Sequence, residues 1–252
     1  MPKNCRTSDL SAYPAYQRLK LQLAGLPELT FSWPPPGQTR IREIVHRGAP
    51  RPTFKYHSFT QQRVLHCESI LEQEALWRLD ACPSVTFICE QPARICFNGQ
   101  DGFTHVPDFL ALVDGAWHVI EIKRLATVTD EVRRRTDRLA ALVAPVARYR
   151  LITEVDLSDE VIADNCRTML RRGRTAPTAD WQERTIAGIR RATQLPLSKY
   201  GWDDSGSVTA EGIAWLLLKG KLVADLKARL CGQTLVRAPL PNERIGEALW
   251  PA

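Results

Sequence analysis

Two short patterns near the middle of the chain combine carboxylates with a lysine. Pro107-Asp108 stands at the start of one apolar, β-rich run, and Glu121-Ile122-Lys123 stands at the end of the next. Carboxylate oxygens are hard ligands suited to Mg²⁺, and a bound Mg²⁺ polarises a phosphate and lowers the pKa of an attacking water. A neighbouring lysine can orient that water or stabilise the developing negative charge. The pattern therefore predicts metal-dependent hydrolysis of a phosphodiester.

The residues between these patterns form a predicted β-hairpin. DFLALV (108–113) and WHVIEIK (117–123) are rich in β-branched and aromatic residues, and Asp114-Gly115 supplies turn chemistry between them. Paired strands lie ~5 Å apart, so Asp108 at the start of one strand can face Glu121 at the end of the other. Because side chains alternate along a strand, Glu121 and Lys123 are expected on one face. Asp108 and Glu121 are thus predicted to share a metal ion.

A helix is predicted immediately upstream and offers a third carboxylate. The segment ESILEQEALWRLD (68–80) contains strong helix formers and is followed by a Cys-Pro boundary. On a helical wheel, Glu68 and Glu72 fall within the apolar stripe, whereas Glu74 points away from it. Burial of an unpaired carboxylate is unfavourable, so an acid on this face is expected to meet a cation or a donor. Glu72 is the preferred third ligand, and Glu68 stays open as the alternative.

A simpler interpretation competes with the metal site. Isolated Asp, Glu and Lys residues commonly form surface ion pairs, and PD followed by E-x-K is a short and frequent pattern. The helix with acids on its apolar face, followed by both patterns in order, favours the metal site. His66 and His105 lie nearby in the sequence, but a metal-bound water does not require a histidine base, so neither is assigned a catalytic role.

The remaining pattern predicts an α/β core followed by a helical domain. Strands are expected at 85–90, 94–97 and 149–153, with a helix at 129–144 between the hairpin and the last strand. Beyond residue 156 the strands stop, and helices are expected after Leu157-Ser158-Asp159, at 180–194 and at 209–219. The division is a basic arm at 1–60, a nuclease domain at 61–155 and a small winged-helix-like domain at 156–252.

The first sixty residues are rich in proline and arginine and show no sustained period. We expect an extended arm with short structured pieces, since proline removes a backbone donor and biases its predecessor away from helix. Basic side chains in and beside this arm can follow a phosphate backbone, and the formal net charge of +6 favours a polyanionic partner. A solvated leader is an equally good interpretation. The candidate DNA contacts are Arg40, Arg42, Arg47, Arg51, Lys55 and Arg63.

Composition limits the remaining possibilities. The 252 residues are 44% hydrophobic and 25% charged, and no apolar run approaches the ~18 residues of a membrane span. The N-terminus lacks the apolar region of a secretory signal, so a cytoplasmic protein is expected. The seven cysteines include no C-x-x-C pair. Cys82, Cys89 and Cys96 recur every seven residues without paired histidines, and are interpreted as small buried hydrophobes.

Several segments together resemble one family. ESILEQEALW, the EQP of 90–92, HVPDFLALV, VIEIK and the YRLITE of 149–154 resemble the TnsA endonucleases, the endonuclease subunits of heteromeric transposases, which carry the PD-(D/E)xK signature. The likeness covers residues 68–154 and is vaguer in the C-terminal helices, while the proline-rich arm matches no family motif. The resemblance implies a restriction-endonuclease-like core, a mixed sheet flanked by helices.

The resemblance also implies a site and an activity. Glu72, Asp108, Glu121 and Lys123 would be catalytic, the three acids would bind Mg²⁺ or a substituting Mn²⁺, and Gln91 would support the site. Members of the family cut the 5′ strand at transposon ends during cut-and-paste DNA transposition, while the DDE transposase TnsB processes the 3′ ends. Their C-terminal domain contacts the AAA+ ATPase TnsC. A stand-alone restriction or repair endonuclease, and an inactive DNA-binding assembly module, are the alternatives.

Overall fold

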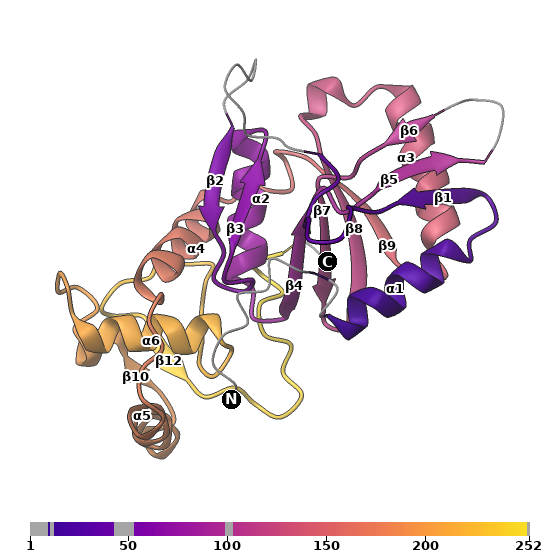
Figure 1. The fold of residues 1–252 in the computed structure, drawn as a ribbon. Helices are drawn as coiled ribbons and strands as arrows, with labels where there is room; N and C mark the ends of the chain where they lie inside the picture. The colour runs from indigo at the N-terminus through magenta and orange to yellow at the C-terminus, as the bar shows by residue number, and fades with distance from the viewer. Residues whose placement is uncertain (1–9, 11–12, 43–52, 99–102, 251–252) are drawn as a thin grey trace. The chain divides into compact units, whose positions relative to one another are not determined.

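The computed structural model describes residues 10, 13–42, 53–98 and 103–250, and it shows a mixed α/β chain (Figure 1). Two compact units are present. Unit 1 comprises Met1–Ala75 and Val85–Asp156, and unit 2 comprises Leu76–Ser84 and Leu157–Ala252. Helix α2 (Ile70–Ala81) therefore begins in unit 1 and ends in unit 2.

A four-stranded mixed sheet forms the centre of unit 1. Its order is β4-β7-β8-β9, with antiparallel pairing except between β8 and β9, which run parallel. The chain passes from β8 to β9 through η2 (Leu125–Thr127) and α3 (Asp130–Val143), as a parallel connection requires. All four strands match the predicted β-rich segments to within one residue at each end. The strands are β4 (Val85–Glu90), β7 (Phe109–Val113), β8 (Ala116–Ile122) and β9 (Arg148–Ile152).

The turn between β7 and β8 fixes the register of the central hairpin. Asp114 and Gly115 both have positive φ, 48° and 77°, which is the conformation of a two-residue type I′ turn. Val113 pairs with Ala116, and the ladder continues to the pair of Phe109 with Ile120. Beyond this pair lie Asp108, which precedes β7, and Glu121, which follows Ile120 in β8. Local turn chemistry thus brings the two predicted metal ligands to the same end of the hairpin.

The N-terminal region differs from the predicted extended arm. Helix α1 (Pro14–Ala24) begins with proline in its first turn, and β1 (Leu29–Ser32) pairs with β5 (Arg94–Phe97), which in turn pairs with β6 (Thr104–His105). The α1 residues Tyr16, Leu19 and Leu23 are buried. These positions form a helical stripe that the surrounding prolines obscured in the sequence.

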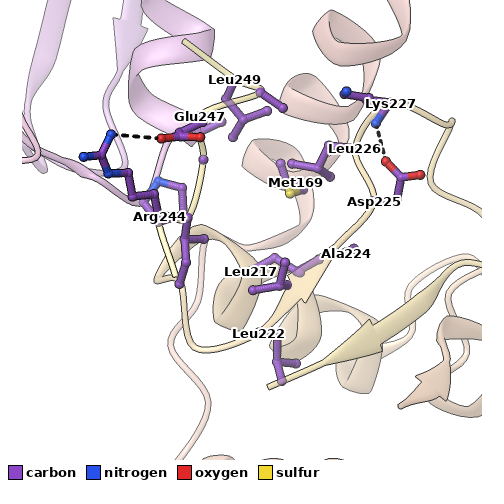
Figure 2. A pocket seen from close by; sticks show the side chains of 16 residues that line it. Met169, Leu217, Leu222, Ala224, Asp225, Leu226, Lys227, Arg244, Glu247 and Leu249 are labelled. Atoms are coloured by element: carbon purple, nitrogen blue, oxygen red, sulfur yellow. Dashed lines mark hydrogen bonds and ion pairs between the residues drawn. The ribbon is translucent and has the colours of Figure 1, made fainter. Parts of the chain in front are cut away.

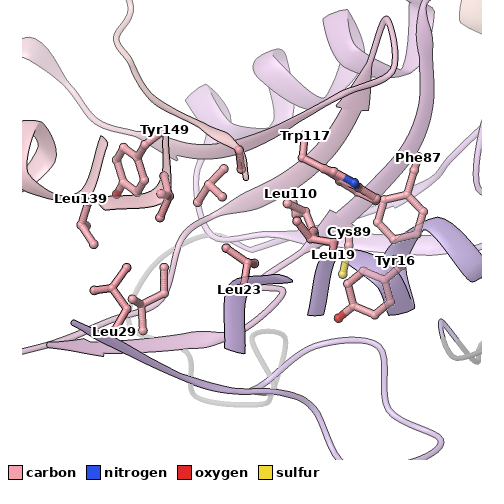
Figure 3. Packing of buried hydrophobic residues seen from close by; sticks show 14 of the residues in the cluster. Tyr16, Leu19, Leu23, Leu29, Phe87, Cys89, Leu110, Trp117, Leu139 and Tyr149 are labelled. Atoms are coloured by element: carbon pink, nitrogen blue, oxygen red, sulfur yellow. The ribbon is translucent and has the colours of Figure 1, made fainter. Parts of the chain in front are cut away.

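The core of unit 1 packs α1 and α3 with one face of the central sheet. Figure 3 shows side chains of α1 beside those of β4, β7 and β8. Phe87 is the centre of an aromatic group, with its ring 5.4 Å from Tyr16 and 5.3 Å from Trp117. Two further strands, β2 (Phe54–His57) and β3 (Val64–Cys67), form a separate hairpin in the same unit.

Unit 2, as far as the structure describes it, contains three complete α-helices and a small sheet. The helices are α4 (Glu160–Arg172), α5 (Ala179–Ala192) and α6 (Val208–Leu218), each with a side-chain cap at its N-terminus, from Asp159, Thr178 and Ser207 respectively. The sheet has the order β10-β12-β11. Its strands are β10 (Leu195–Pro196), β11 (Val223–Ala224) and β12 (Leu235–Arg237), and η3 (Leu197–Tyr200) precedes α6.

The end of the described chain belongs to the interior of unit 2. Leu249 and Trp250 are buried. Leu249 and its neighbours line an apolar pocket of about 180 Å³ together with Met169 of α4 and Leu217 of α6 (Figure 2). The C-terminal segment is therefore a structural part of this unit.

Two expectations from composition concern the described residues. No helix among them is long and apolar enough to cross a membrane. Their cysteines carry free thiols; Cys82 and Cys89 are buried and Cys96 is partly buried, in keeping with the predicted packing role.

Candidate active site

Asp108 lies where three strands of the central sheet end. It immediately precedes β7, and its Oδ2 accepts a hydrogen bond from the backbone N–H of Ile122 at the end of β8 (2.6 Å). The Asp108 carbonyl accepts one from the N–H of Gln91, just after β4 (2.8 Å). The aspartate is therefore held by both neighbouring strands.

The surroundings of Asp108 disfavour its charged form. Burial raises its pKa well above the usual value, and repulsion from Glu72 and then from Glu121 adds to this effect. The Ile122 N–H and the Lys123 ammonium oppose it only in part. Asp108 thus lies next to the end of β8, where its hydrogen-bond donor Ile122 stands between Glu121 and Lys123, and the charge of Glu72 also acts on it.

Glu72 also has a structural role that we did not predict. Its Oε2 accepts a hydrogen bond from the Glu68 N–H (2.7 Å), its Oε1 accepts one from the Ser69 hydroxyl (2.9 Å), and Ser69 Oγ accepts one from the Glu72 N–H. This reciprocal arrangement is a variant of the capping box, and the S-x-x-E spacing of 69–72 could have revealed it. Burial raises the pKa of Glu72 although these donors lower it.

Glu68 occupies a different environment. Helix α2 begins at Ile70, so the helical wheel that placed Glu68 on the buried face does not apply to it, and that step of the sequence argument was wrong. Its side chain is 35% exposed and forms an ion pair with Arg42 at 2.7 Å. Glu72 is thus the acid of this segment whose charge acts on Asp108, although which of the two would bind a metal directly stays a prediction.

Glu121 is the most heavily coordinated side chain of the site. Its Oε1 contacts Lys123 Nζ (2.8 Å) and an Arg135 nitrogen (2.9 Å), while its Oε2 contacts His105 Nε2 (2.5 Å) and the Tyr149 hydroxyl (2.6 Å). Burial raises the pKa of Glu121, but the contacts with His105, Lys123 and Tyr149 outweigh burial and hold the pKa at about 2. This carboxylate is therefore ionised at neutral pH.

Three of these partners were missed or set aside from the sequence. His105 comes from β6, Arg135 from α3 and Tyr149 from β9. Tyr149 reaches the site because it pairs with Val119 in the parallel ladder, and no local pattern specifies a parallel register. Arg135 lies in a run of three arginines that resembles an ordinary solvated helix face.

Lys123 marks the more open side of the site. Its side chain is 30% exposed, and its backbone N–H donates to Ile152 of β9 (3.0 Å). The contact of Lys123 Nζ with Glu121 places both side chains on the same face, as the alternation along β8 predicted. Lys123 can therefore meet both the carboxylate and a molecule arriving from solvent.

Gln91 and several arginines surround the site. Gln91 has a positive φ of 42°, and its Oε1 accepts a hydrogen bond from Arg42 Nε (2.8 Å). Arg40 and Arg63 both pair with the buried Glu90 carboxylate, at 2.8 and 2.7 Å. Three of the predicted DNA contacts thus have acidic partners within the protein.

The other predicted DNA contacts are in different positions. Lys55 is exposed on β2, and Arg47 and Arg51 lie outside the described residues. Binding of DNA by any of the six stays a prediction.

The acids do not form a finished metal-ligand set. Among the described residues, no group of three or more His, Cys, Asp and Glu side chains is arranged to hold a metal ion. The hydrogen bonds explain this, because Glu72 is turned towards its own helix cap and both oxygens of Glu121 are engaged. The oxygen-rich donor set still suits a hard divalent cation.

No protein-family model matches this chain, and no curated protein matches it either.

Proposed function

We propose that the chain is a divalent-metal-dependent DNA endonuclease with Glu72, Asp108, Glu121 and Lys123 at its active centre. One observation carries the proposal: the Asp108 carboxylate accepts a hydrogen bond from Ile122, the residue between Glu121 and Lys123, at the end of β8 (2.6 Å). Lys123 contacts Glu121 at 2.8 Å, and the charge of Glu72 on α2 contributes to the raised pKa of Asp108. A surface ion pair on an edge hairpin would not be buried or coupled in this way.

The residues fit a hard cation. Repulsion raises the pKa of Asp108, and a divalent ion is the partner that would relieve it. Asp108 and Glu121, with Glu72 after a change of rotamer, would hold Mg²⁺ or Mn²⁺ through carboxylate oxygens. The ion would supply Lewis-acid polarisation of the scissile phosphate. Lys123 would orient the attacking water or neutralise charge on the phosphate.

The fold of unit 1 supports the restriction-endonuclease-like interpretation. The mixed sheet β4-β7-β8-β9, with its parallel last pair, is the kind of core that the resemblance to TnsA implies. On this basis the chain would hydrolyse the 5′ strand at transposon ends, as the endonuclease subunit of a heteromeric transposase. A TnsB-like DDE transposase would process the other strand.

Unit 2 supports a role in protein docking. The order α5-β10-η3-α6-β11-β12, with β12 in the middle of the sheet, follows the winged-helix pattern. The helix in the place of the recognition helix is α6, and seven of its eleven residues are buried, among them Leu216, Leu217 and Leu218. Little of α6 would be available to enter a major groove. We therefore assign unit 2 to contact with a TnsC-like ATPase rather than to base reading.

A second function is favoured by the hydrogen bonding of the acids. Glu72 caps its helix, and Glu121 has four partners, so both have structural roles in the absence of a metal. An assembly module that binds DNA and partner proteins without cutting fits these contacts. Binding of a divalent cation separates this function from the nuclease, as does cleavage.

The test is cleavage of a transposon-end duplex in Mg²⁺, with the neighbouring transposase and ATPase present. We expect Asp108→Ala and Lys123→Ala each to lose the 5′-strand cut while the 3′-strand cut persists. Unchanged cutting in both variants would remove the active-site assignment. A stand-alone nuclease would instead cut without the two partners, and an adjacent methyltransferase gene would support that alternative.

A further inference from the structure

Arg135 is one of three partners of Glu121 that the proposed active centre does not include, and it is the one with a permanent positive charge. It reaches the carboxylate from α3, at the second turn of the helix, and contacts Oε1 through one terminal nitrogen at 2.9 Å. Lys123 contacts the same oxygen. The opposite oxygen is held by His105 and Tyr149, the latter a buried side chain. The two oxygens of Glu121 therefore differ, with the Arg135 side being the more accessible.

The guanidinium of Arg135 has donors that Glu121 does not use. Its Nε–H is buried and has no hydrogen-bond partner among the described residues. The group lies over the Phe103 ring, 5.2 Å from the ring centroid, and its side chain is 20% exposed. An arginine fork binds a carboxylate or phosphate best through two parallel hydrogen bonds, and the single contact with Glu121 leaves that capacity unused.

A metal ion and the Arg135 guanidinium would compete for Glu121. A divalent cation on Oε1 of Glu121 would repel a guanidinium bound to the same oxygen. A DNA phosphate brought to the cation would offer the displaced guanidinium new acceptors a short distance away. Resting on the function proposed above, we propose that Arg135 is a phosphate-binding residue of the site, held on Glu121 until metal and DNA arrive.

The test separates metal binding from DNA binding, and neither requires turnover. Arg135→Gln removes the charge, and Arg135→Lys keeps the charge but removes the fork. The matched control is Arg138→Gln, one turn further along α3, where Arg138 lies 3.8 Å from Glu28 and over the Phe97 ring. Ca²⁺ and Mn²⁺ affinity would be measured by calorimetry without DNA. Affinity for a duplex in Ca²⁺ would be measured by fluorescence anisotropy at several salt concentrations.

We expect Arg135→Gln to bind Ca²⁺ at least as tightly as the wild type, because a competitor for Glu121 is removed. Its DNA affinity in Ca²⁺ should fall about tenfold or more, and the slope of log affinity against log salt should decrease by about one. Arg135→Lys should keep the wild-type salt slope, because the charge remains, but its DNA affinity should fall nearly as far as that of Arg135→Gln, because the fork is lost. Arg138→Gln should leave Ca²⁺ affinity unchanged.

Two results would overturn the proposal. Weaker Ca²⁺ binding by Arg135→Gln with unchanged DNA affinity would mean that Arg135 only positions Glu121. An equal loss of DNA affinity in Arg138→Gln would mean a general charge effect of α3. Failure of the proposed function would give a different result. Calorimetry would then detect no binding of Ca²⁺ or Mn²⁺ by the wild-type protein, and none by Asp108→Asn.

Discussion

At the scale of single residues, Glu121 shows how a buried charge is made compatible with a folded core. Desolvation of a carboxylate is unfavourable unless donors replace the lost water. Four side chains do so here, three of them from β6, α3 and β9 and one from Lys123 just after β8, and the pKa of Glu121 is held at about 2. Such a side chain is held in one orientation by the protein alone, as a ligand of the proposed metal site would need to be.

The Tyr149–Glu121 hydrogen bond is open to a double-mutant cycle. Tyr149→Phe and Glu121→Gln, singly and together, should give a coupling free energy of about 1.5 to 3 kcal/mol, because the acceptor is ionised and the pair is buried. Urea denaturation at pH 7 measures it. A coupling near zero would show that His105, Lys123 and Arg135 hold Glu121 without the tyrosine.

His118 predicts a pH dependence of stability. It is buried on β8, and burial, followed by repulsion from Arg150 and Arg148, lowers its pKa from 6.5 to about 4. Between these pH values the unfolded chain binds a proton that the folded chain does not. The free energy of unfolding should therefore decrease as the pH falls from about 7 to about 4.

The variant His118→Gln isolates this contribution. As the pH falls through this range, the free energy of unfolding should decrease in both proteins, but the decrease should be about 2 kcal/mol smaller in the variant than in the wild type. Denaturation curves at several pH values provide the comparison, and parallel curves for the two proteins would contradict the assignment of the low pKa to His118.

At the scale of elements, the β7–β8 hairpin depends on a turn that glycine makes possible. Gly115 has φ of +77°, and a Cβ there would meet no atom within 4 Å, so Gly115→Ala tests backbone strain alone. We expect a loss of about 1 kcal/mol in unfolding free energy. Gly188→Ala is the matched control, since a Cβ in this helical position of α5 also meets open space.

The control should change stability in the opposite direction. Alanine at Gly188 should stabilise the protein by about 0.5 to 1 kcal/mol, because alanine loses less backbone entropy in a helix. Both changes are measured by thermal and urea unfolding. Equal effects of the two substitutions would remove the positive φ of Gly115 as the cause.

The sequence predicted best those elements that are specified by interactions between residues close together in the chain. The hairpin around Asp114-Gly115 and the helices capped by Asp159 and Ser207 are encoded within a few residues, and the sequence predicted each closely. Tyr149 and Arg135 reach Glu121 through a parallel pairing and a helix-to-sheet contact. Those interactions depend on the tertiary fold, so local patterns contain no information on them.

At the scale of the whole molecule, the two units are not consecutive in the chain. We predicted a boundary near residue 156, and Leu157 does begin the main part of unit 2, but Leu76–Ser84 belong to it as well. Arg78, in this inserted segment, is buried and donates to the carbonyls of Leu157 (2.7 Å) and Asp159 (2.8 Å). A buried guanidinium without these acceptors is strongly unfavourable.

A fragment ending at residue 156 should therefore be less stable than unit 1 is within the full chain. We expect a lower midpoint of thermal unfolding, with part of the loss recovered by Arg78→Met in the fragment. The same substitution in the full chain should destabilise it, since there the arginine has its acceptors. If Arg78→Met did not raise the midpoint of the fragment, Arg78 would have no part in this dependence.

The charge and the fold together predict that this chain alone has little preference for one base sequence over another. If the chain binds DNA as proposed, its net charge of +6 would give affinity for phosphates that is independent of sequence, and α6, with most of its residues buried, would offer little surface for reading a major groove. The purified protein should thus bind unrelated duplexes of equal length with affinities within about tenfold, far below the discrimination of a specific DNA-binding protein. Competition anisotropy in Ca²⁺ measures this directly. A preference of about a thousandfold for one sequence would place a base-reading element in this chain, whereas a preference that arises only when the transposase is added assigns site choice to the partner.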